Sequence, residues 1–285
     1  MCGTVQRNPL HRSDTTMFNS STTACYIKCI FFATTKLVEL QKIIKVGAVS
    51  YLNTKPLMYA FKHGLQINGM EIIEEYPAKI GGMLLNNEID VGLVPVAIIP
   101  KLREHYIISD YCIGAEGAVA SVCLFSEVPL EKIEKVILDY QSNTSVALAR
   151  VLVENYWKLQ VVFEEAKENF RDEIKGTTAA VVIGDRAFEQ RKISVYSYDL
   201  ATAWIDFTGL PFVFAAWVAN KKLPEDFIKR FNEANKEGLE NIGAVVAENV
   251  SPFYDLKKYF SQNISYQLTK EKQKGLGKFL SFLKK

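Results

Sequence analysis

From Ile43 onward, short apolar segments alternate with segments of helical spacing, and this alternation limits the possible folds more than any other feature of the sequence. Residues 90–94 and 179–183 have the length and composition of buried strands. Helical segments lie between such strands, and the one at residues 146–157 is mostly apolar. Strands that alternate with helices predict an α/β fold with a largely parallel sheet.

Two unusually long apolar runs, at residues 118–125 and 212–218, enclose a compact middle section. We predict that the chain crosses at the first run into a second lobe and returns at the second run. The first lobe then combines residues 43–125 with 218–285, and the second lobe holds residues 126–217. This is a two-lobed clamshell, in which the ligand cleft lies between lobes joined by two crossing strands.

Residues 1–42 differ from the rest of the chain, because residues 1–23 are rich in Ser, Thr and Asn and lack periodicity. The apolar run at residues 25–33 is too short to span a bilayer. It also lacks the preceding basic region and the cleavage site of a signal peptide. We expect a disordered extension, which could be translated from upstream of the true start, and a non-standard export signal is the alternative.

The composition narrows the function classes. Lys and Arg number 34 against 32 Asp and Glu, so the charge gives no reason to expect binding to nucleic acid or to a membrane surface. No other segment could cross a membrane, and five cysteines without a CxxC pair fit a reduced compartment, so we expect a soluble cytoplasmic protein. Three scattered histidines and the lack of nucleotide or metal motifs predict a site without cofactor or metal.

Small hydroxyl and amide residues gather at three predicted junctions between a strand and a helix, residues 50–54, 142–145 and 184–185. In open parallel sheets, ligands bind at the carboxyl ends of the strands, where helix N-termini offer free amides and a positive dipole end. Such a cleft suits carboxylates. The alternative is that Asn53, Thr144 and Ser145 only cap helices, and Asp185 fits a cap better than a catalytic acid.

Several of these segments together resemble chorismate dehydratase, an enzyme family of the futalosine route to menaquinone. The similar segments are residues 46–57 (VGAVSYLNTKPL), 117–126 (GAVASVCLFS), 138–145 (LDYQSNTS) and 208–217 (TGLPFVFAAW). The resemblance covers residues 43–284, and it implies a type II periplasmic-binding-protein fold that serves as a cytoplasmic hydro-lyase. The family converts chorismate to 3-[(1-carboxyvinyl)oxy]benzoate and water, without a cofactor.

The resemblance also assigns roles to residues. It implies that the amide of Asn53 acts on the departing hydroxyl or on the developing negative charge. An amide is a poor base, so the enolpyruvyl carboxylate of the substrate itself is the expected proton acceptor. The candidate residues for substrate binding are Ser50, Tyr51, Ser121, Ser142, Thr144, Ser145 and Asp185. The sequence departs from the family at Ala201, where we expect Gly, and at the apolar residues 96–98.

Two other functions remain open. A solute-binding protein for a small carboxylate would have the same fold and no catalysis, since function depends on the site rather than on the fold. The second alternative is the dihydroxynaphthoate-forming lyase of the same pathway. Its opening motif, Ser-Pro-Cys-Pro-Asn-Asp, is replaced here by Ser-Tyr-Leu-Asn-Thr-Lys-Pro at residues 50–56.

Overall fold

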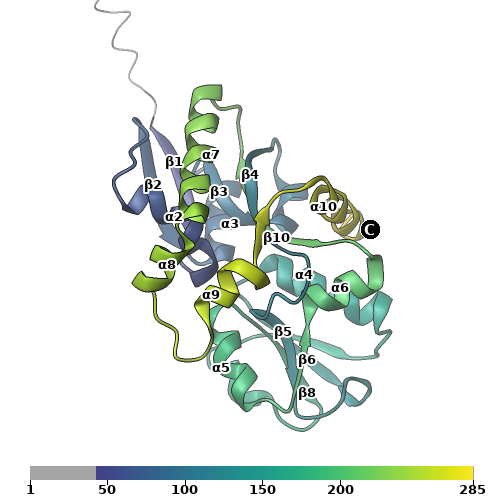
Figure 1. Ribbon diagram of the computed structural model, residues 1–285. Coiled ribbons are helices and arrows are strands. Elements are labelled where there is room, and N and C mark those ends of the chain that lie inside the picture. Colours follow the sequence, from purple (N-terminus) through teal and green to yellow (C-terminus); the bar gives the residue numbers. More distant parts are fainter. Residues whose placement is uncertain (1–42, 285) are drawn as a thin grey trace, which may run out of the picture. The chain divides into compact units, whose positions relative to one another are not determined.

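The computed structural model describes residues 43–284, which contain two β-sheets (Figure 1). In spatial order, the six-stranded sheet consists of β11 (Ser265–Gln267), β4 (Tyr106–Ala115), β10 (Phe212–Ala219), β3 (Val91–Pro95), β1 (Ile44–Val49) and β2 (Met70–Glu75). The five-stranded sheet consists of β7 (Val162–Glu165), β6 (Lys135–Leu138), β8 (Thr178–Ile183), β5 (Val122–Ser126) and β9 (Tyr196–Asp199). The predicted N-terminal extension, residues 1–42, lies outside the described residues.

Both sheets are mixed, so the prediction of a largely parallel sheet is wrong. Strand β1 runs parallel to β2 and β3, but β10 runs antiparallel to both β3 and β4. In the other sheet, β6 is parallel to β7 and β8, while β5 is antiparallel to β8 and β9. An apolar run indicates a buried strand without its direction, and direction depends on where the chain re-enters a sheet.

The chain passes from the first sheet to the second between β4 and β5, through residues 116–121, and it returns between β9 and β10. Strand β10 is apolar throughout because it is central and buried at every position. The lobe boundaries, 43–125 with 218–285 and 126–217, stay a prediction. Strand β5 lies in one sheet with β6 to β9, which belong to the middle section of the chain. Strand β10 lies in the other sheet with β1 to β4 and β11, which come from the N-terminal and C-terminal sections.

Helices pack on both sheets. Helix α3 (Pro77–Leu85) contacts β1 and β3, whereas α5 (Asp185–Ile193) and α6 (Leu200–Thr208) contact β5. Helix α4 (Asn143–Val151) contacts β8 in one sheet and β10 in the other, so it links the two. The remaining helices are α2 (Lys55–Lys62), α7 (Glu225–Glu240), α8 (Ile242–Glu248), α9 (Leu256–Lys258) and α10 (Lys270–Phe282).

The close packing of α7 against α2 explains why residue 238 is a glycine. A Cβ atom at Gly238 of α7 would lie 1.8 Å from the carbonyl oxygen of Pro56 in α2, so the two helices approach closely only because residue 238 has no side chain. This contact fixes α2, which follows β1 after the short segment 50–54. The loop between β1 and α2 therefore has a rigid element at each end.

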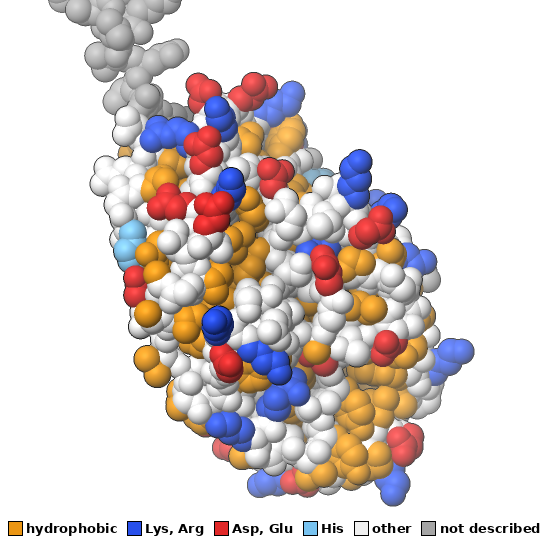
Figure 2. Space-filling model, viewed as in Figure 1, with side chains coloured by type: hydrophobic (Ala, Val, Ile, Leu, Met, Phe, Trp, Pro, Cys, Tyr) orange, Lys and Arg blue, Asp and Glu red, His pale blue; other side chains and the backbone are white. Residues whose placement is uncertain are grey.

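The surface carries no single-sign patch on the face shown in Figure 2, where basic and acidic side chains are intermixed. No helix within residues 43–284 is long and apolar enough to cross a membrane. Helix α10 docks through buried Leu276 and Phe279, as its helical spacing indicates. One lysine of this helix, Lys272, is fully buried and pairs with Glu116 at 2.9 Å.

Candidate functional site

A small cavity of about 40 Å³ lies between the two sheets. Val49 and Pro95, at the carboxyl ends of β1 and β3, line it from the first sheet, and Ile183, at the carboxyl end of β8, lines it from the second. The full lining is Val49, Tyr51, Asn53, Thr54, Pro77, Pro95, Ile113, Val119, Ser121, Val122, Ser142, Ser145, Ile183, Gly184, Phe214 and Ala215. This is the expected place for a ligand site in an α/β fold.

The cavity wall consists of neutral groups. None of the lining side chains found among residues 43–284 is charged. Helices α2, α4 and α5 each begin beside the cavity, next to Thr54, Ser142 and Gly184 respectively. The first amides of a helix have no intrahelical acceptor, and they carry the positive end of the helix dipole. Together with the hydroxyls, these amides suit a small ligand with carboxylate groups.

The loop before α4 is preorganised by its own side chains. The Ser142 Oγ accepts a hydrogen bond from the Ser145 amide at 3.2 Å and lies 3.0 Å from the Ser145 Oγ. Buried Asp139 accepts from the Gln141 amide at 3.1 Å and pairs with Arg186 at 2.7 Å. Burial raises the pKa of Asp139, and the Arg186 guanidinium opposes that rise. The two serines therefore occupy fixed positions at the cavity wall.

Asn53 lies on the single helical turn Leu52–Thr54 that leads into α2. Its Oδ1 accepts from the Thr54 hydroxyl at 3.3 Å, and its backbone oxygen accepts from the Tyr266 hydroxyl at 2.9 Å. The neighbouring Leu52 amide donates to the Asp185 carboxylate at 3.3 Å. With Oδ1 engaged, the amide nitrogen of Asn53 is the group left to donate.

Ser121 is fully buried at the end of the segment that crosses between the sheets. Its hydroxyl oxygen accepts a hydrogen bond from the Tyr259 phenol at 2.7 Å. Asp199 holds the preceding residues, because its carboxylate accepts from the amides of Val119 at 3.2 Å and Ala120 at 2.7 Å. Ala120 has a left-handed backbone, with φ of 65°, which turns the chain so that Ser121 follows at the cavity.

Gly184 is the second position where a side chain is excluded. It has φ of 64° and ψ of −148°, a conformation that is essentially restricted to glycine. A Cβ atom here would lie 2.9 Å from the ring of Tyr51. The Gly184 amide donates to the Ser121 carbonyl at 2.8 Å. This glycine therefore lets the loop before α5 approach both Tyr51 and Ser121.

Of the residues predicted from the sequence, Tyr51, Asn53, Ser121, Ser142 and Ser145 line the cavity. The other three do not. The Thr144 Oγ1 accepts from the Ala97 amide at 3.1 Å, Ser50 is exposed, and Asp185 accepts from the Leu52 amide. Their substrate-binding roles stay predictions. Trp204 and Trp217 are buried packing residues, and Cys112 and Cys123 are buried free thiols.

The sequence analysis did not predict three residues near the cavity, Gln141, Tyr259 and Tyr266. Gln141 lies in the segment 138–145, so its proximity to the site could have been inferred. Tyr259 and Tyr266 lie far along the chain, on a π-helical turn (Tyr259–Asn263) and on β11. No local motif marks these two tyrosines, because their contacts with Ser121 and Asn53 exist only in the folded chain.

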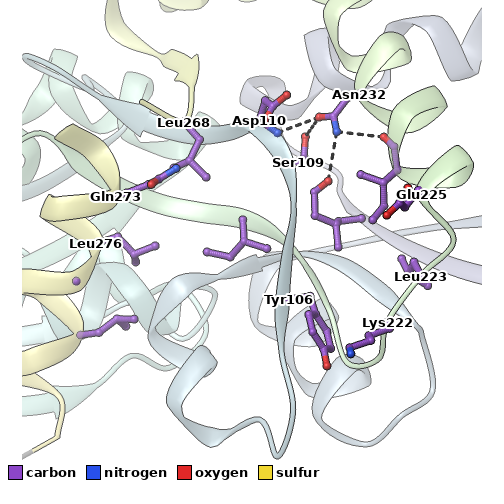
Figure 3. Close-up of a pocket in the computed structure, with 15 residues that line it drawn as sticks. Tyr106, Ser109, Asp110, Lys222, Leu223, Glu225, Asn232, Leu268, Gln273 and Leu276 are labelled. Atoms are coloured by element: carbon purple, nitrogen blue, oxygen red, sulfur yellow. Dashed lines mark hydrogen bonds between the residues drawn. The ribbon is translucent and has the colours of Figure 1, made fainter. Parts of the chain in front are cut away.

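A much larger hollow, of about 970 Å³, lies on the surface between β4, α7 and α10 (Figure 3). Three of its polar lining residues, Ser109, Asp110 and Asn232, bond to one another. The Asn232 Oδ1 accepts from the Ser109 hydroxyl at 2.8 Å and from the Asp110 amide at 2.9 Å. These bonds satisfy the backbone where β4 and β10 shift register. The hollow lies at the amino end of β4, away from the strand ends that meet at the cavity, so we assign the site to the smaller cavity.

Comparison with known proteins identifies the family of this chain. A family model described as menaquinone biosynthesis matches residues 44–285. The chain belongs to this family. A chorismate dehydratase of Thermus thermophilus is 27% identical, over 84% of this chain and 94% of that protein. A chorismate dehydratase of Campylobacter jejuni is also 27% identical, over 80% of this chain and 92% of that protein.

Solved structures show the fold of this member of the menaquinone biosynthesis family. A protein of Archaeoglobus fulgidus matches with a TM-score of 0.67 at 16% identity, covering 85% of this chain and 96% of that one. A Candida albicans protein, described as having the generic periplasmic binding protein fold, matches with a TM-score of 0.56 at 13% identity, covering 85% and 90%. The predicted two-lobed, periplasmic-binding-protein-like fold is confirmed.

Proposed function

We propose that this chain is a chorismate dehydratase, a hydro-lyase that converts chorismate to 3-[(1-carboxyvinyl)oxy]benzoate and water. The observation that carries the proposal is the cavity itself, where neutral donors and the N-termini of α2, α4 and α5 meet. Chorismate carries two carboxylates and a ring hydroxyl, which match such donors. The two chorismate dehydratases that this chain resembles support the choice of substrate.

The reaction needs few groups from the protein. The C3–H bond and the C4–O bond of the substrate ring break, and in the sum of the reaction the proton and the hydroxide are released as water. The electron pair of the C3–H bond completes an aromatic ring, which supplies much of the driving force. The enzyme therefore has to hold both carboxylates, stabilise the leaving hydroxyl and leave a proton acceptor in reach.

The proton acceptor in this proposal is the enolpyruvyl carboxylate of the substrate. The described part of the cavity wall presents no carboxylate and no imidazole. Burial raises the pKa of Tyr51, so its phenol stays protonated and cannot accept the proton. An internal carboxylate has the advantage of a high effective concentration next to the C3–H bond.

Asn53 is the proposed catalytic residue, since its side-chain amide can donate to the departing hydroxyl or to developing negative charge. Ser121, Ser142 and Ser145 are the proposed carboxylate-binding residues at the wall. Loss of one such charge-assisted bond should cost about 1.5–3 kcal/mol, mainly in affinity. A biosynthetic enzyme of this kind also fits a cytoplasmic location.

The direct test incubates the purified chain with chorismate, without added cofactor, and analyses the product by mass. We expect a species one water lighter than chorismate. Asn53→Ala should lower kcat by about 10²- to 10³-fold, as loss of a donor to developing charge does elsewhere. Asn86→Ala is the matched control, because Asn86 is exposed at the end of α3 and does not line the cavity.

If folded wild-type protein leaves chorismate unchanged, the proposal that this chain is a chorismate dehydratase is wrong. Saturable binding of chorismate without turnover would then favour the alternative, a solute-binding protein with the same fold. The dihydroxynaphthoate-forming lyase is not favoured, since both relatives are chorismate dehydratases.

A further inference from the structure

Tyr259 contacts the site from a distant part of the chain. It opens the π-helical turn Tyr259–Asn263 and is fully buried. Its ring packs edge-on against Phe188, with 4.8 Å between the ring centroids. Its phenol donates a hydrogen bond to the Ser121 Oγ at 2.7 Å. The aromatic packing and this bond together fix the phenol oxygen beside the cavity.

The direction of this bond determines which acceptor the Ser121 hydroxyl can donate to. A hydroxyl has one proton to donate. Because the Ser121 oxygen already accepts from Tyr259, its own O–H must donate to a different acceptor. Within residues 43–284, no side chain or carbonyl accepts that proton. Because Ser121 lines the cavity, the remaining direction for its O–H is toward a bound ligand.

Asn53 meets the same phenol. Burial raises the pKa of Tyr259 far above its usual value, and hydrogen bonds with Ser121 and Asn53 oppose this rise only in part. The phenol therefore keeps its proton and stays a donor to Ser121. Nearby side chains hold the surrounding backbone, since the Asn263 amide donates to the Ala118 carbonyl at 2.8 Å and Tyr266 donates to the Asn53 carbonyl.

We propose that Tyr259 is a positioning residue, which orients the Ser121 hydroxyl as a hydrogen-bond donor toward an anionic oxygen of the bound substrate. The identity of that substrate rests on the proposed function. Tyr259 itself does not line the cavity. It acts through Ser121, so its contribution should vanish when the Ser121 hydroxyl is removed.

A double-mutant cycle tests this dependence. Steady-state turnover of chorismate is measured for wild type, Tyr259→Phe, Ser121→Ala and the double variant. We expect Tyr259→Phe to lower kcat/KM about tenfold in the wild-type background, as loss of one oriented hydrogen bond does. In the Ser121→Ala background, the same change should cost less than about twofold. Equal losses in both backgrounds would overturn the proposal.

Tyr254→Phe is the matched control, because Tyr254 stacks on the same Phe188 and its hydroxyl bonds to Asn263 rather than to Ser121. This variant should keep the kcat/KM of the wild type. A loss equal to that of Tyr259→Phe would mean that any damage to the aromatic cluster is sufficient, and it would also overturn the proposal.

Denaturant unfolding of the four proteins in the cycle distinguishes failure of the proposed function from failure of the positioning role of Tyr259. If wild type leaves chorismate unchanged, the proposed function fails, and unfolding still reports on the Tyr259–Ser121 bond. Unfolding midpoints that shift non-additively support that bond, since neighbouring groups couple in stability. Additive midpoints would show that the two side chains do not interact, and this would overturn the positioning role whatever the substrate.

Discussion

At the scale of single residues, burial sets the protonation states around the cavity. It raises the pKa of Tyr51 and of Tyr259, although the Arg186 guanidinium opposes the change at Tyr51 and the Ser121 and Asn53 side chains oppose it at Tyr259. It also raises the pKa of Cys112 to about 12. A raised pKa extends the neutral form of an acid to higher pH. These groups therefore act as neutral packing groups or donors rather than as bases.

The alkaline side of the pH profile should accordingly be flat. We expect kcat/KM for chorismate to stay constant between about pH 7 and 9, because the neutral tyrosines do not ionise there and the substrate carboxylates are already charged. Steady-state kinetics across this range provide the measurement. A rise governed by a pKa inside it would instead reveal a protein base, and it would contradict the internal base of the substrate.

The sequence could reveal some of these residues and not others. Asn53 lies in the loop after β1 and Ser142 in the loop after β6, so each is near the carboxyl end of a strand, where ligands bind in α/β folds. Thr144 belongs to the same motif, yet its hydroxyl accepts from the Ala97 amide. Tyr259 lies outside every motif. Which hydroxyl faces a ligand depends on tertiary contacts that spacing along the chain does not contain.

At the scale of elements, Asp199 joins two segments that flank the site. It caps α6 by accepting from the amides of Ala201 at 3.1 Å and Thr202 at 3.2 Å. The same carboxylate holds the amides of Val119 and Ala120 in the crossing segment before Ser121. One side chain thus fixes both the start of a helix and the left-handed turn at Ala120.

Replacement of Asp199 should therefore damage stability and the site together. Asp199→Ala should lower the free energy of unfolding by about 2–4 kcal/mol, from a lost cap and buried amides without acceptors. Denaturant unfolding measures this loss. Asp199→Asn keeps one carbonyl oxygen and should lose less. An alanine variant as stable as wild type would show that solvent replaces the carboxylate.

Element prediction succeeded where strands are apolar and failed at three of the four edge strands. The central strands β3, β8 and β10 were visible as buried apolar runs. Strands β7, β9 and β11 were missed, because they are short and only partly buried. The run at residues 118–125 was read as one strand, but β5 begins only at Val122, after the turn that Asp199 holds.

At the scale of the whole folded unit, several bonds close the cavity between the sheets. The Tyr51 phenol, after β1, donates to the Gln141 side chain, after β6. The Ala78 amide at the start of α3 donates to the Gln141 carbonyl at 3.1 Å. The enclosed space of about 40 Å³ is far below the roughly 300–1,000 Å³ of typical ligand sites. We therefore expect the sheets to separate when a substrate the size of chorismate binds.

Weakening one of these bonds should speed binding. Tyr51→Phe removes only the phenol hydroxyl, so the ring still covers Gly184. We expect chorismate to associate about two- to tenfold faster, as the loss of one hydrogen bond lowers the cost of opening. Stopped-flow fluorescence measures the rate, and Tyr106→Phe is the control because its hydroxyl bonds to the exposed Glu104 and its ring lines the other hollow. An unchanged rate for Tyr51→Phe would mean that this bond does not limit opening.

The position of β10 also determines the order in which the protein can assemble during synthesis. All strands of the five-stranded sheet, from β5 to β9, are contiguous in sequence, so that sheet can form as soon as its residues leave the ribosome. The six-stranded sheet is completed later, because β10 lies between β3 and β4 in the sheet and is translated after both of them. Ser121 gains Tyr259 later still. A nascent chain therefore carries an unfinished, exposed sheet edge until its last segments arrive.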